Sequence, residues 1–152
     1  MPKYKLPMFS QPPSGTKAQQ YMHRARMFRD AANKLSDYSN GEQFLPKYAL
    51  LTHAIELSLK AFELHSVATG KPSGTRPSNH DLRGWYLLAL QYGLKEDPSI
   101  TENIELLSEL HFTHYTRYPQ EPPARSVPDL SVATDETVDY LIGNFTPLIN
   151  PR

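Results

Sequence analysis

Apolar residues recur at spacings of three and four along most of the chain, which predicts amphipathic α-helices. A first helix is predicted over about residues 16–39. Its apolar face holds Tyr21, Ala25, Phe28, Ala32 and Leu35. Asn40 and Gly41 are expected to end it, because both residue types tolerate the left-handed conformation found after helices.

A second helix is predicted over about residues 46–69, with Pro46 at its first position and Gly70 at its C-cap. It carries two adjacent apolar stripes. These are Tyr48, Leu51, Ile55, Leu59 and Phe62, and Leu50, Ala54, Leu57, Ala61 and Leu64. Together they cover more than half the circumference, so this should be the most buried helix. A narrow polar stripe remains, formed by His53, Glu56, Lys60 and Glu63.

Three further helices follow from capping and proline signals. A short helix over about residues 81–92 has Asn79 or His80 near its cap and ends at Gly93. Ser99 and Glu102 form a capping box that begins a helix running to about residue 118. Thr134 is expected to cap the last helix. Its apolar face holds Val138, Leu141, Phe145 and Leu148.

No segment shows sustained alternation of apolar and polar residues, so no strand is predicted. Residues 71–79 and 119–131 are loops by composition, and residues 1–15 form an extended arm. The expected fold class is all-α. We predict an up-and-down helical bundle of four main helices plus one short helix, in a single domain over residues 16–150.

Charge and composition narrow the function classes. Sixteen basic and sixteen acidic side chains cancel, so any contact with nucleic acid must come from a local patch. No cysteine occurs, which excludes disulfides and thiolate nucleophiles and suits a cytoplasmic protein. The longest clearly apolar run, "WYLLAL" at 85–90, is far too short to span a membrane, and no membrane partner is expected.

The stretch "HFTHYTRYP", residues 111–119, holds the first candidates for chemistry. His111 and His114 lie three apart on the stripe that should face the core. They could share a metal ion, but no further ligand pair accompanies them, so structural imidazoles are the favoured interpretation. We predict no metal and no cofactor.

Arg117 lies near the end of the same predicted helix, between Tyr115 and Tyr118. Its charge suits the helix macrodipole, and its guanidinium also suits phosphate or carboxylate recognition beside aromatic rings that stack on bases. Other polar groups are expected to converge with it in a groove. The predicted ligand-binding set is Glu56, Lys60, His80, Asp81, Arg117 and Tyr118.

Three segments taken in order resemble the HEPN superfamily. They are "HAIELSLKAFEL" at 53–64, "HDLRGWYLLAL" at 80–90 and "ELHFTHYTRYP" at 109–119. The resemblance spans about residues 18–145. It implies a bundle of four to five helices, commonly a homodimer, often paired with a nucleotidyltransferase in toxin–antitoxin or defence systems. Many members are metal-independent ribonucleases whose site is an arginine followed after a short gap by a histidine.

The chain departs from that ribonuclease pattern. After a gap of four residues from Arg117, Pro122 stands where the histidine would be, and no histidine occurs after His114. We therefore expect a binding or adaptor module that takes a nucleotide, RNA or an acidic segment of a partner protein, without clear catalysis. One alternative is a divergent metal-independent ribonuclease using Arg117 with His111 or His114. Another is a purely structural dimerisation bundle.

Overall fold

The computed structural model describes residues 15–35, 41–112 and 127–150. These residues form α-helices joined by loops, with no strand, so the predicted all-α bundle is confirmed. The helices are α1 (Lys17–Asn33), α2 (Gly41–Ala68), α3 (Leu82–Gln91), α4 (Pro98–Phe112) and α5 (Val127–Ile149). As predicted, one of them, α3, is short. The predicted arm lies outside the described residues, apart from Gly15.

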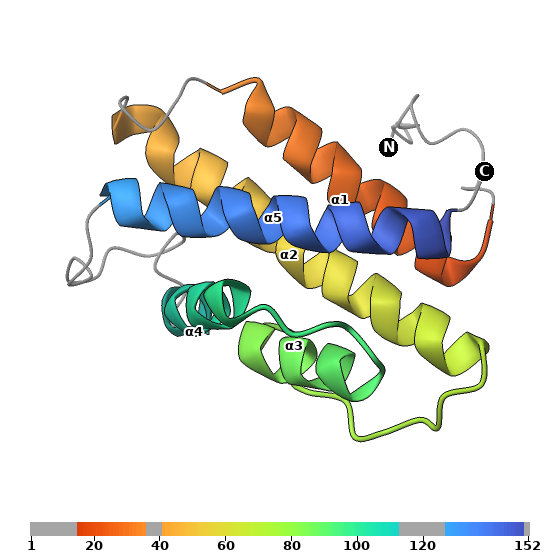
Figure 1. Cartoon of the computed structure of the whole chain (residues 1–152). Coiled ribbons are helices and arrows are strands. Elements are labelled where there is room, and N and C mark those ends of the chain that lie inside the picture. Colours follow the sequence, from red (N-terminus) through yellow and green to blue (C-terminus); the bar gives the residue numbers. More distant parts are fainter. Residues whose placement is uncertain (1–14, 36–40, 113–126, 151–152) are drawn as a thin grey trace, which may run out of the picture.

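Helix α2 is the centre of the bundle. It packs against α1 and α5 on one side and against α3 on the other, and α4 packs against both α3 and α5. Figure 1 shows this arrangement, with α3 and α4 below α2 and with α1 and α5 above and in front of it. The polar stripe of α2 is accordingly covered in part, since Glu56 and Glu63 are buried whereas the His53 side chain is 40% exposed.

The core follows the predicted stripes of α2. Leu51, Ile55 and Leu59 are fully buried, and the ring of Phe62 stacks on Phe145 of α5 with centroids 4.5 Å apart. Full burial of one such side chain stabilises the fold by about 1.5–3 kcal/mol. Burial of the apolar side chains explains why α2 forms despite Pro46. The free energy gained by burying many apolar side chains offsets the loss of one backbone hydrogen bond.

Two helix ends differ from the sequence prediction. α1 ends at Asn33, six residues earlier than expected, and the described chain stops at residue 35 before resuming at Gly41. α2 already begins at Gly41, so Gly41 does not terminate α1 and Pro46 lies inside α2. Pro46 is close to the helix start, where its missing N–H removes an early hydrogen bond and leaves the rest of the ladder intact.

The later helices also start differently. The backbone N–H of Ser99 donates to Oδ1 of Asp97 at 2.9 Å, so Asp97 caps α4 and Pro98 occupies its first position. α5 starts at Val127, and Thr134 is fully buried inside it instead of capping it. The last turn of α5 buries Ile149, while Leu148, predicted to face the core, is 53% exposed.

Candidate functional site

The buried carboxylate of Glu56, on α2, contacts basic side chains of α2 and of the loop before α3. The Glu56 side chain is only 3% exposed. Its Oε1 lies 2.9 Å from Nδ1 of His80, which precedes α3. Its Oε2 lies 3.4 Å from Nζ of Lys60 and 3.6 Å from Nδ1 of His53, one turn away on α2. A carboxylate removed from water needs such partners, because burial of an uncompensated charge is strongly unfavourable.

A second carboxylate lies two turns further along α2. Glu63 is 5% exposed, and its Oε1 lies 3.4 Å from Nε of Arg76, in the loop before α3. The indole of Trp85, which is 2% exposed, lies close to a basic partner of each carboxylate. The Arg76 guanidinium carbon lies 5.2 Å and the Lys60 nitrogen 5.5 Å from the centroid of this ring, within the range of cation–π attraction.

We call this group of side chains the Trp85 cluster. It comprises His53, Glu56, Lys60, Glu63, Arg76, His80 and Trp85.

The loop 71–81 is fixed to the helices by side chains of α3 and its C-cap. The hydroxyl of Tyr92 donates to the carbonyl of Pro72 at 3.0 Å and accepts from the N–H of Gly74 at 3.1 Å. The indole N–H of Trp85 donates to the carbonyl of Ser78 at 2.9 Å. A loop without secondary structure is thereby held in one path, and that path places Arg76 and His80 beside α2.

Asp81 follows His80 in the sequence but contacts the backbone of α3 and not the carboxylate of Glu56. It is the N-cap of α3, and its Oδ1 accepts a hydrogen bond of 2.9 Å from the N–H of Gly84. A side chain at position 84 would collide with the Asp81 carboxylate and would place its Cβ 2.9 Å from Cβ of Pro77. Glycine at 84 thus permits the close approach of the loop and the cap to α3.

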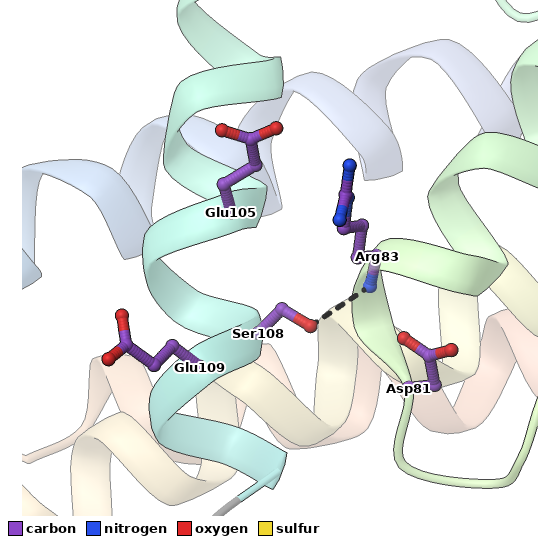
Figure 2. Close-up of a pocket in the computed structure, with 5 residues that line it drawn as sticks. All are labelled: Asp81, Arg83, Glu105, Ser108 and Glu109. Carbon is purple, nitrogen blue, oxygen red and sulfur yellow. Dashed lines mark hydrogen bonds between the residues drawn. The ribbon is translucent and has the colours of Figure 1, made fainter.

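Asp81 also lines a shallow groove of about 520 Å³ between the start of α3 and α4. Figure 2 shows Asp81 and Arg83 on one side and Glu105, Ser108 and Glu109 on the other. The backbone N–H of Arg83 donates to Oγ of Ser108 at 3.2 Å, which joins the two helices across the floor of this groove. The groove carries three carboxylates and one guanidinium, so it is acidic overall.

The exposure of the Trp85 cluster is uneven. Glu56, Glu63 and Trp85 are buried, and the Lys60 side chain is 12% exposed. The side chains of Arg76, His80 and His53 are 54%, 41% and 40% exposed. The carboxylates therefore lie beneath, and a guanidinium and two imidazoles are accessible. This polarity suits recognition of an anion, since the groups that water and ligands reach are the basic ones.

The structure brings together three of the predicted ligand-binding residues, Glu56, Lys60 and His80. Asp81 caps α3 and lines the acidic groove instead, whereas the sequence predicts Asn79 or His80 near this cap. Arg117, Tyr118 and His114 lie outside the described residues. His111 belongs to α4, but its side chain is also outside the described part. Whether any of these residues binds a ligand stays a prediction.

Sequence reasoning did not include Arg76, Trp85, His53 or Glu63 in the site. A signal existed for Glu63 and His53, because both share the polar stripe of α2 with Glu56. No comparable signal existed for Arg76 and Trp85. Their positions depend on the path of the loop 71–81, which tertiary hydrogen bonds to Tyr92 and Trp85 determine.

Within residues 15–35, 41–112 and 127–150, no group of three His, Asp or Glu side chains is placed to hold a metal ion. None of the helices in that part of the chain has the length and apolar character needed to cross a bilayer.

Comparisons of the chain with protein-family models, with curated proteins and with solved structures find no match.

Proposed function

We propose that the protein is a HEPN-like binding module that takes a phosphate-bearing ligand, a nucleotide or RNA, at the Trp85 cluster. The observation that carries this proposal is the arrangement of charge there: Arg76 and His80 are accessible, and each contacts a buried carboxylate of α2. Basic groups held in place before binding lose less conformational entropy when the ligand arrives. Arg117 and Tyr118 are proposed to add a second guanidinium and a stacking ring.

The binding energy would come mainly from Arg76 and His80, which with His53 are the accessible basic groups of the cluster. The Nε of Arg76 is directed to Glu63, and more than half of its side chain remains in contact with solvent. A guanidinium offers paired N–H donors to phosphate oxygens, and an imidazole N–H adds one more. The chain is neutral overall, so the attraction is local and should weaken with added salt.

A thermal-shift panel of nucleotides and short RNA tests this proposal. The wild type is expected to melt several degrees higher with ligand, because binding to the folded state at 100 Kd contributes about 2.7 kcal/mol. Arg76→Gln and Arg117→Ala should reduce the shift. Arg24→Gln, which alters an exposed arginine on α1, is the matched control and should retain it. No shift in the wild type would contradict the proposal.

The resemblance also supports two wider proposals, a homodimer and a nucleotidyltransferase-type protein partner in a toxin–antitoxin or defence system. The lack of cysteine supports a third, a cytoplasmic location. The ribonuclease alternative assigns Arg117 and either His111 or His114 to RNA cleavage. Cleavage by the wild type that is lost in Arg117→Ala would support it.

A second candidate function, a purely structural bundle, is favoured by one specific observation. Glu56 and Lys60 form an ion pair whose side chains are 3% and 12% exposed, so part of the cluster is internal and already compensated. A fully satisfied polar network fixes packing without binding anything. In that case the cluster variants would lower the melting temperature of the protein, and no ligand in the panel would raise it.

A further inference from the structure

A mostly apolar groove of about 480 Å³ lies at one end of the bundle. Its lining differs from the Trp85 cluster, which is made mainly of charged side chains. The first turn of α1, the last turns of α2 and the last turn of α5 meet at the groove. Its apolar lining consists of Ala18, Leu64, Ala68, Leu148 and Ile149, and polar side chains make up the remainder. We call it the end groove.

The end groove is a fixed feature of the helix packing. The side-chain amide of Gln19 donates to the carbonyl of Ile149 at 3.1 Å, which ties the start of α1 to the end of α5. Ala18 and Ile149 are buried, whereas Leu148 is 53% exposed. About half of the Leu148 side chain is therefore exposed to solvent in a concave, mostly apolar surface. Such a surface favours the docking of an apolar segment.

The chain itself supplies a candidate occupant. Thr16, the N-cap of α1, lines the end groove, so the residues before Gly15 leave the described structure at its rim. Gly15 has a φ of 96° that redirects the chain at this point. Residues 1–14 include four large apolar side chains. They are Tyr4, Leu6, Met8 and Phe9.

Residues 1–14 are long enough to reach the end groove, and their prolines reduce the conformational entropy that docking would cost. Phe9 and Thr16 are seven positions apart, and an extended chain covers about 3.3–3.6 Å per residue, so Phe9 can reach any part of a groove that Thr16 lines. Prolines at 7, 12 and 13 restrict φ, which reduces the conformational entropy lost on docking.

We infer that residues 1–14 dock into the end groove of the same chain, with Leu6 and Phe9 covering Leu148. This inference is independent of the proposed function at the Trp85 cluster. A second copy of the chain that supplies the same segment is the competing occupant, and the experiment below separates the two.

A double-mutant cycle in the full-length protein tests the inference. Leu148→Ser should lower the melting temperature by about 2–4 °C in the wild-type background, the change expected for a loss of roughly 1 kcal/mol in a chain of this size. In a background carrying Leu6→Ser and Phe9→Ser, the same substitution should have a clearly smaller effect, because only the contacts of Leu148 with the bundle itself are then lost. Leu148→Met, which retains the apolar contact, should melt near the wild type.

The matched control is Leu87→Ser. Leu87 is a similarly exposed leucine, 44% accessible on α3, and the end groove does not include it. Its substitution should have the same effect in both backgrounds. Equal effects of Leu148→Ser in the two backgrounds would overturn the inference.

Cross-linking then identifies which copy supplies the segment. Leu148→p-benzoylphenylalanine places a photoreactive group in the end groove. Cross-links from position 148 to residues 1–14 in a species of monomer mass would support docking within one chain. Cross-links to the same residues confined to a species of twice that mass would overturn it in favour of exchange between two copies.

Discussion

The Nδ1 atom of His80 lies 2.9 Å from Oε1 of Glu56, although the two residues are 24 positions apart in the sequence. This contact joins the end of the loop 71–81 to the buried polar stripe of α2. It requires that the loop passes over α2 before α3 begins, and Trp85 and Tyr92 hold it on that path. The position of one imidazole thus depends on a buried carboxylate and on hydrogen bonds from another helix.

The first prediction concerns the charge of Glu56. Glu56→Gln keeps the shape of the side chain but leaves Lys60, which is 12% exposed, without a negative partner. We expect the free energy of unfolding to fall by about 1–3 kcal/mol, measured by urea titration. Glu105→Gln, on the exposed face of α4, is the control and should change stability by at most roughly 0.5 kcal/mol.

The same variant tests the contact with His80. If Glu56 and His80 stabilise each other, His80→Gln should be less damaging in the Glu56→Gln background than in the wild type, with a coupling energy of about 0.5 kcal/mol or more. Strict additivity of the two substitutions would show that this contact contributes nothing to folding.

The second prediction concerns the start of α3. Asp81→Ala removes the oxygen that accepts from the N–H of Gly84, so we expect a loss of about 1 kcal/mol in the free energy of unfolding. Asp81→Asn retains an acceptor and should lose less. If the alanine and asparagine variants unfold at the same urea concentration, Asp81 does not act as a cap.

The third prediction is a dependence on alkaline pH. Burial raises the pKa of Tyr48 above its ordinary value of 10.0. Above pH 10 the unfolded chain therefore releases the phenolic proton while the folded protein retains it, which stabilises the unfolded state and lowers the free energy of unfolding as pH rises. Below that pH this group adds no pH dependence.

Tyr48→Phe removes the titrating group and should flatten this decline. Urea titrations of both proteins at about pH 8 and about pH 10.5 measure the difference. Burial also raises the pKa of Tyr140, which remains in both proteins and so cancels in the comparison. A decline of equal size in the two proteins would contradict the assignment to Tyr48.

Much of the fold could be predicted from the sequence, because helix formation depends on local spacing. The stripes of α2 and the glycine stop at Gly93 follow from periodicity and turn chemistry within a few residues. The first residues of α4 and α5 are harder to predict from the sequence. Asp97 competes with Ser99 as the cap of α4, and the burial of Thr134 depends on helices far away in sequence.

The candidate site could be predicted in part. Glu56 and Lys60 lie one turn apart on one helix, so their pairing follows from helical geometry. His80 contacts Glu56 as well, but the inclusion of Arg76 and Trp85 depends on the path of a loop that has no periodic pattern. Local rules cannot supply that path, because hydrogen bonds between the loop and α3 determine it.

Trp85 provides the most direct test of phosphate binding at the Trp85 cluster. It is the single tryptophan of the chain, and its ring has the Lys60 and Arg76 cations within 5.5 Å of its centroid. The measurement is tryptophan fluorescence during titration with inorganic triphosphate, followed by nucleotides and short RNA with correction for their absorbance. The proposal predicts a saturable change in the wild type that Arg76→Gln weakens and Arg24→Gln preserves. An unchanged signal with every probe, or the same curve in Arg76→Gln, would contradict it.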